Sequence, residues 1–154
     1  MRILVEILAT LGVVYSHLVD LNLMLCRVSG LNSGSLLGYG YYCGSGSFGD
    51  LVPVDPTDRC CMWHDNCYGT HEDICTGRLN PKNVHYKWAV KTIGSKKKIL
   101  CLDNSTSLCA LYACQCDAWF SHCIYKMKGH LDPSFYKRHG YVRSFVHWVN
   151  GLYQ

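Results

Sequence analysis

The sequence is poor in charged side chains, which make up 17% of its 154 residues, whereas hydrophobic side chains make up 49%. This balance excludes intrinsic disorder for most of the chain. The sequence has no internal repeat, which excludes a solenoid, and no apolar run of the roughly 20 residues that a membrane span requires. The excess of 15 Lys and Arg over 11 Asp and Glu is too small to indicate nucleic-acid binding, but it suits an anionic or zwitterionic surface.

The first 16 residues have the pattern of a secretory signal peptide. Arg2 supplies a positive charge, residues 3–15 are mostly apolar, and Val14 and Ser16 are small enough for a cleavage site that ends at Ser16. Glu6 interrupts the apolar run, and the alternative is a buried N-terminal helix. We expect this segment to be removed and the rest of the chain to be secreted.

Cysteine is the residue that the sequence has in excess, with 11 copies. In an oxidising compartment cysteines pair, so a small exported chain is stapled by disulfides. The alternative is a metal site, because Cys60-Cys61-x-x-His64 and Cys114-x-Cys116 have the spacing of metal ligands. Asn104-Ser105-Thr106 is an N-glycosylation acceptor, which agrees with export and makes Asn104 a candidate site.

Two segments are predicted to be helices. One covers residues 60–72 behind the turn and N-cap cluster at 55–58, and the other covers residues 106–128, which contain no Pro or Gly. Cys60 and Cys67 in the first have the same seven-residue spacing as Cys116 and Cys123 in the second. Antiparallel helices could therefore be joined at two levels about 10 Å apart. Ten cysteines allow on the order of a thousand pairings, so other connectivities stay open.

This arrangement of the two helices would bring a histidine and an aspartate close together. His64 lies between the two cysteines of the first helix, and Asp117 follows a cysteine of the second. An Asp beside a His holds one ring nitrogen and leaves the other as a general base. Asp65 follows His64 on the same helix, so its side chain points about 100° around the helix axis from that of His64. The glycine-spaced turn at residues 39–47 exposes backbone carbonyls, and carbonyls with a carboxylate suit calcium better than zinc.

Three ordered motifs carry a resemblance to a known family. Cys60-Cys61-Met62-Trp63-His64-Asp65-Asn66-Cys67 resembles the active-site signature of the secreted, calcium-dependent phospholipases A2. Tyr39-Gly40-x-Tyr42-Cys43-Gly44-x-Gly46 is similar to the calcium loop of that family, and Cys114-Gln115-Cys116-Asp117 with Cys123 to its second long helix. The resemblance runs from His17 to Cys123. A Gly-x-Ser-x-Gly motif is absent, which disfavours a serine esterase.

The resemblance implies a role for each matching residue. His64 would be the general base, Asp117 would orient it, and Gly44 would donate its amide to the oxyanion. One calcium ion would be bound by Asp65 and the backbone carbonyls of Tyr42, Gly44 and Gly46. Tyr68 and Tyr86 would donate hydrogen bonds to Asp117, although Tyr86 could equally be an ordinary packed aromatic.

The resemblance also implies a fold. It is mainly α and disulfide-rich, with two long antiparallel bridged helices, an N-terminal helix, a calcium loop and a small β-wing at residues 88–102. The implied disulfides are Cys43–Cys61, Cys60–Cys123, Cys67–Cys116, Cys75–Cys109 and Cys101–Cys114. Cys26 is then the odd cysteine, either free or bonded to a second copy as a dimer.

The chain departs from the family pattern in three places. Tyr41 stands where the family usually has a cysteine that is bonded to the C-terminal extension. No cysteine follows Cys123, so both ends of that disulfide are absent. Ser47 replaces a glycine of the calcium loop, and about two extra residues follow it, which leaves the calcium affinity open. Residues 126–154 form a basic extension with an aromatic stripe at residues 141–152, which would either lie on an anionic membrane or pack on the domain.

The expected organisation is a signal peptide at 1–16, a phospholipase A2-like domain at 17–125 and the basic extension at 126–154. The expected function is calcium-dependent hydrolysis of the sn-2 ester of glycerophospholipids in anionic membranes or micelles, outside the cell and with no nucleic-acid partner. The alternative is a catalytically silent relative that acts as a toxin, receptor ligand or matrix protein. Such relatives typically lose the His or the calcium-binding Asp, and this chain keeps His64, Asp65 and Asp117.

Overall fold

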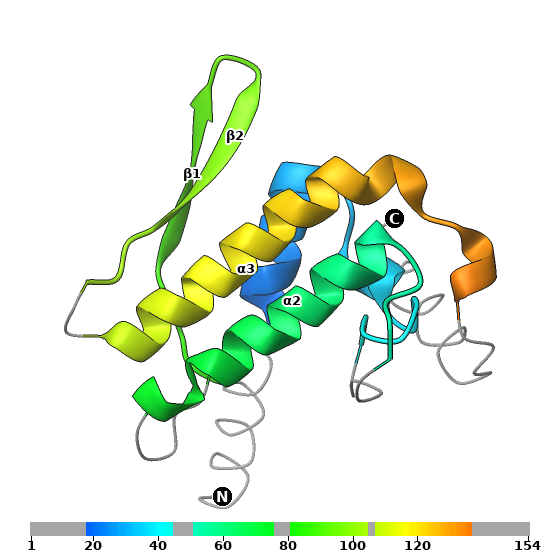
Figure 1. Cartoon of the computed structure of the whole chain (residues 1–154). Helices are drawn as coiled ribbons and strands as arrows, with labels where there is room; N and C mark the ends of the chain where they lie inside the picture. The colour runs from blue at the N-terminus through cyan, green and yellow to red at the C-terminus, as the bar shows by residue number, and fades with distance from the viewer. Residues whose placement is uncertain (1–17, 45–50, 76–80, 105–106, 137–154) are drawn as a thin grey trace, which may run out of the picture.

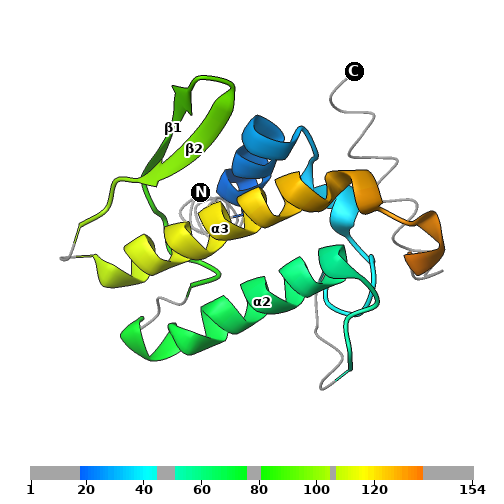
Figure 2. The same ribbon diagram turned by 45° about the horizontal axis from the view of Figure 1, so that its top comes forward.

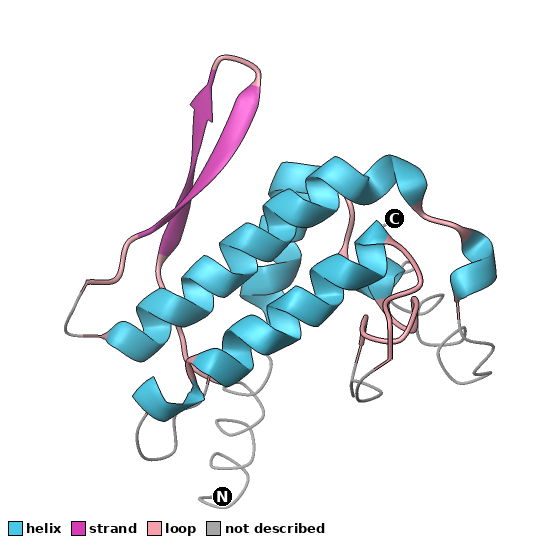
Figure 3. Ribbon diagram, in the orientation of Figure 1, coloured by secondary structure: helices cyan, strands magenta, loops and turns pink. Residues whose placement is uncertain are grey.

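The computed structural model describes residues 18–44, 51–75, 81–104 and 107–136 (Figure 1). These residues are mainly helical with one small antiparallel sheet (Figure 3), as predicted. In chain order the elements are a helix over residues 18–29, η1 (Ser33–Leu36), α2 (Pro56–Thr70), η2 (Glu72–Ile74), β1 (Trp88–Ile93), β2 (Lys96–Cys101), α3 (Leu108–Met127), η3 (Lys128–His130) and η4 (Pro133–Phe135). In the residues described, no helix is both long and apolar enough to cross a bilayer.

Helix α2 begins where its sequence favours a start. The Asp55 side chain accepts a hydrogen bond from the backbone N–H of Asp58 at 2.8 Å, and Pro56 occupies the first turn. A proline there has no N–H to leave unsatisfied, and the aspartate satisfies one of the donors that a helix start exposes. The helix therefore begins earlier than residue 60, because the cap cluster is part of its first turn.

Helices α2 and α3 run side by side in opposite directions (Figure 1). The disulfides Cys60–Cys123 and Cys67–Cys116 join them, with Cα–Cα distances of 5.9 and 5.8 Å. This is the two-level bridge that the matched seven-residue spacing predicts. The helix over residues 18–29 packs against the pair (Figure 2), and its Leu21 and Leu25 are buried with Phe120 and Ile124 of α3.

The remaining disulfides attach the other parts of the domain to these two helices. Cys43–Cys61 joins the loop before α2 to that helix, Cys75–Cys109 joins η2 to α3, and Cys101–Cys114 joins β2 to α3. The five bonds are those that the family resemblance implies. Cys26 is the free cysteine of the described residues, and its side chain is exposed.

The wing formed by β1 and β2 projects from the helices (Figure 1). The two strands pair in an antiparallel register from Trp88 opposite Cys101 to Ile93 opposite Lys96. The base of the wing is anchored, because Ile99 is buried with Ala110 and Ala113 of α3. The predicted wing at residues 88–102 is thus present.

The chain after α3 returns to the body of the domain. Tyr136 forms a backbone bridge with Tyr39, its ring contacts that of Tyr39 edge-on at 5.0 Å, and its hydroxyl donates to the Ser35 carbonyl at 2.7 Å. The beginning of the extension is therefore packed on the domain. The aromatic stripe at 141–152 and the segment at 1–16 lie outside the described residues, so the signal peptide and the domain boundary at 125 stay predictions.

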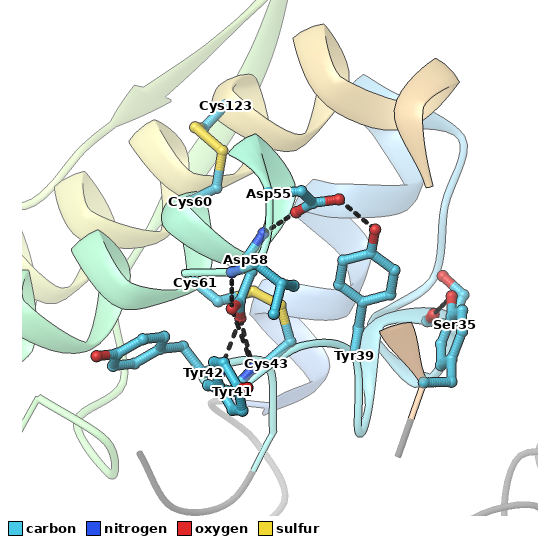
Figure 4. Close-up of a disulfide and its surroundings, with 12 residues drawn as sticks. Ser35, Tyr39, Tyr41, Tyr42, Cys43, Asp55, Asp58, Cys60, Cys61 and Cys123 are labelled. Carbon is cyan, nitrogen blue, oxygen red and sulfur yellow. Dashed lines mark hydrogen bonds between the residues drawn. A yellow bond between two sulfur atoms is a disulfide. The ribbon is translucent and has the colours of Figure 1, made fainter. Parts of the chain in front are cut away.

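Asp58 organises the loop that precedes α2 (Figure 4). Its carboxylate is fully buried and accepts backbone N–H hydrogen bonds from Tyr41, Tyr42 and Val54 at 2.8–3.0 Å. A buried carboxylate is tolerated when such donors surround it. Gly40 lets the backbone approach this closely, because a methyl group there would lie 2.2 Å from the Asp58 Cγ.

Gly40→Ala is expected to lower the free energy of unfolding by about 3 kcal/mol or more, since the new methyl group collides with Asp58 and φ is +56°. Gly94→Ala is the matched control: its φ is +61°, but a methyl group there meets no described atom within 4 Å. We expect the control to cost about 1–2 kcal/mol from backbone strain alone. Urea unfolding with the disulfides intact measures both, and equal losses would contradict the close approach.

Candidate active site

A histidine and an aspartate meet between α2 and α3. The Nε2 of His64 lies 2.7 Å from Oδ1 of Asp117. Asp117 is fully buried and His64 is 8% exposed. An ionised carboxylate only accepts hydrogen bonds, so the Nε2 position carries the proton and donates it to Asp117. The Nδ1 atom is then the ring nitrogen with a lone pair for a proton, which is the arrangement of a general base.

Two tyrosines complete the surroundings of Asp117. The hydroxyl of Tyr68 donates to Oδ1 at 2.5 Å, and the hydroxyl of Tyr86 donates to Oδ2. Burial raises the pKa of both phenols, and the negative charge of Asp117 raises each further. Both therefore stay protonated and donate at any working pH. The structure thus brings together the four residues that the sequence indicated for this network.

Aromatic rings hold the imidazole of His64 in place. Phe120 stacks on it with ring centroids 4.5 Å apart, and Tyr68 contacts it at the same distance. Phe120 follows Asp117 by one turn of α3 and therefore lies on the same face. Phe120 is not among the residues predicted from the sequence, although its one-turn spacing from Asp117 could have indicated it.

The residues expected to bind calcium lie partly in the described chain. Tyr42 and Gly44 lie in the loop that Asp58 holds, Asp65 lies on α2, and Gly46 falls outside the described residues. The N–H of Cys43 donates to the Tyr39 carbonyl. In a trans peptide N–H and C=O point in opposite directions, so the Tyr42 carbonyl points away from Tyr39.

The donor set of Tyr42, Gly44 and Asp65 consists of oxygen atoms, which fits a hard cation such as calcium. The φ of Gly44 is +129°, a backbone conformation that glycine adopts readily. Asp65 is half-buried, and this burial raises the pKa of its carboxyl, while the positive charge of Lys82 opposes the rise. A cation bound there would relieve the cost of burying the ionised carboxylate.

The cysteines do not form the alternative metal site. Cys60, Cys61, Cys114 and Cys116 are all in disulfides, so none offers a thiolate to a metal. His64 donates to Asp117 instead of joining them. Asn104, the candidate for glycosylation, has an exposed side chain.

Tyr68→Phe and Tyr86→Phe are each expected to lower the free energy of unfolding by about 1.5–3 kcal/mol, because each removes a hydrogen bond to a buried carboxylate. Tyr112→Phe is the control, since this half-buried ring stacks on His71 at 4.2 Å, away from Asp117. We expect it to change stability by less than about 0.5 kcal/mol. Urea unfolding with intact disulfides is the measurement. A Tyr86→Phe effect no larger than that of the control would make Tyr86 merely a packed aromatic.

The sequence of this chain is similar to a known protein family. Residues 18–135 match the family model described as phospholipase A2. The chain is 34% identical over 110 residues to the basic phospholipase A2 nigroxin B of Micrurus nigrocinctus. The matched region covers 71% of this chain and 86% of that protein. It is 36% identical over 115 residues to a phospholipase A2 of Calliactis polypus, covering 64% of each.

A third relative is the basic phospholipase A2 beta-bungarotoxin A-AL4 chain of Bungarus multicinctus, 41% identical over 86 residues and 56% of each chain. The chain thus spans just under two thirds of the Calliactis polypus protein and more of the Micrurus nigrocinctus one. The family model covers the two bridged helices, the wing and the His64–Asp117 pair. The chain therefore belongs to the phospholipase A2 family.

Proposed function

We propose that the chain is a calcium-dependent phospholipase A2 that hydrolyses the sn-2 fatty acyl ester of glycerophospholipids at a lipid surface. The products are a free fatty acid and a lysophospholipid. The observation that carries this proposal is the buried hydrogen bond between His64 and Asp117, which leaves Nδ1 of the imidazole for a proton. Membership of the family supports phospholipid as the substrate class.

His64 would act first as a base and then as an acid. Its Nδ1 removes a proton from water while the water oxygen attacks the ester carbonyl carbon. The imidazolium that forms is stabilised by the Asp117 carboxylate, which the two tyrosine hydroxyls keep in place. The proton then passes to the glycerol oxygen as the ester C–O bond breaks, so His64 returns to its neutral form.

Asp65 and the carbonyls of Tyr42, Gly44 and Gly46 would hold one calcium ion. When bound, the ion supplies positive charge for the ester carbonyl oxygen and the substrate phosphate. The amide of Gly44 would donate a second hydrogen bond to the oxyanion. Asp58 supports this role, because its hydrogen bond to the Tyr42 N–H holds the loop against the helix that carries Asp65.

The setting proposed for this reaction is extracellular. The described cysteines other than Cys26 are all paired, which is the state that an oxidising compartment favours. Anionic membranes or micelles are the proposed lipid partners, in keeping with the net charge of +4. A dimer bonded through the exposed Cys26 remains a proposal as well.

His64→Gln is expected to lower phospholipid turnover by about 10²- to 10⁴-fold, because it removes the base that activates water. His130→Gln is the matched control, since His130 is exposed in η3 after α3. Fatty-acid release from vesicles with calcium is the measurement. Comparable activity of His64→Gln and the control would refute the mechanism, and an inactive native chain would favour the catalytically silent alternative.

Asp65→Asn is expected to abolish calcium binding while His64→Gln retains it. In the native chain, burial raises the pKa of Asp65, so protons compete with calcium at a higher pH than for an ordinary aspartate. Calcium affinity should therefore fall as the pH is lowered through that raised pKa. Calorimetric titration at several pH values measures this, with the exposed Asp73→Asn as control. Calcium affinity that is independent of pH between neutrality and pH 4 would argue against Asp65 as a ligand.

A further inference from the structure

A basic cleft lies between the wing and the second half of α3. Its volume is about 420 Å³, and its lining residues are Ile93, Lys96, Lys97, Lys98, His122 and Lys126. The lysines at 96–98 come from β2, whereas His122 and Lys126 are one turn apart on α3. Positively charged side chains from two separate elements therefore face one concave space.

This cleft is separate from the candidate active site. His122 follows Asp117 by five residues on α3, so it points about 140° around the helix from it. The proposed catalytic and calcium-binding residues do not line the cleft. A ligand bound there would leave His64 free to act.

The positive charges in the cleft are unbalanced. No carboxylate lines it, and in the described part of the chain none pairs with Lys96, Lys98 or Lys126. Lys98 also lies directly opposite Lys91 in the sheet, and like charges in that position destabilise a strand pair. Burial, Lys126 and Lys98 together lower the pKa of His122. The free protein thus keeps a repulsive cluster that a bound anion would neutralise.

Hydrogen bonds hold the two sides of the cleft, the wing and the end of α3, in place. The Nζ of Lys97 donates to the Arg27 carbonyl at 2.8 Å, which ties the wing to the end of the helix over residues 18–29. Lys128 donates from beyond α3 to the Ser29 carbonyl at 3.0 Å. Both sides of the cleft are thus tied to the end of the same helix.

We propose that the cleft binds a phosphate group with two negative charges, carried by a soluble phosphate or by the headgroup of an anionic phospholipid. Such a group offers several oxygen atoms to donors that approach from different sides. The ammonium groups of Lys98 and Lys126 and the protonated ring of His122 are these donors. This binding requires neither calcium nor hydrolysis, so it stands independently of the proposed function.

The first experiment uses inorganic phosphate without calcium. The NMR signal of the His122 ring is followed from pH 5 to 8, and His122→Gln identifies it. Phosphate should shift the signal saturably and raise the pKa of His122, because a nearby anion favours the charged imidazolium. Chloride at equal ionic strength should do neither. Equal responses to phosphate and chloride would overturn the proposal.

Paired substitutions distinguish a binding site from an ordinary solvated charge run. The double variant Lys98→Gln, Lys126→Gln should bind phosphate about tenfold more weakly. The free double variant should also be slightly more stable to urea than the native protein, because a repulsion has been removed. Lys87→Gln, an exposed lysine outside the cleft, should leave phosphate affinity unchanged. Equal losses in the double variant and the control would again overturn the proposal.

A second experiment identifies the source of the phosphate. Vesicles of ether-linked phosphatidylcholine, with and without ether-linked phosphatidic acid, cannot lose acyl chains and are tested in chelator. If the lipid headgroup is the source, phosphatidic acid should increase vesicle binding by the native chain but much less by the double variant. If the increase is the same for the double variant, the phosphate bound in the first experiment comes from solution.

Discussion

The two disulfides between α2 and α3 are the constraint on which the candidate site depends. His64 lies between Cys60 and Cys67, and Asp117 follows Cys116, so the bonds set the separation of the imidazole and the carboxylate. They also close long stretches of chain, with sequence separations of 63 and 49 residues, which removes conformational freedom from the unfolded state. This stabilisation offsets part of the cost of burying Asp117 completely.

Much of this arrangement could be predicted from the sequence, because it follows from helical periodicity. Two cysteine pairs with the same seven-residue spacing place their side chains on one stripe of each helix. Residues between or beside these cysteines therefore lie near the interface of the two helices. The positions of His64 and Asp117 therefore followed from local spacing. The family motifs added the full disulfide pairing and the two tyrosines, whose hydroxyls do meet Asp117 in the structure. Tyr86 precedes β1, where no periodicity links it to either helix.

The parts that the sequence did not reveal depend on contacts between distant residues. Asp58 reads as one of several polar residues at a helix start, and Asp55 takes the capping role there. The carboxylate of Asp58 is instead directed to the loop 16 and 17 residues earlier, and neither spacing nor composition marks that contact. The same holds for Tyr39, whose ring meets Tyr136 near the other end of the described chain.

Asp58 also fixes both sides of the loop that departs from the family pattern. Its carboxylate accepts hydrogen bonds from Tyr42 on one side of residues 45–50 and from Val54 on the other. The Cys43–Cys61 disulfide adds a covalent tie to the first side. Ser47 and the extra residues lie between these anchors, which are attached to the helix that carries His64 and Asp65. The proposed base and the proposed calcium ligand therefore lie on the same helix as the carboxylate that fixes both sides of this loop.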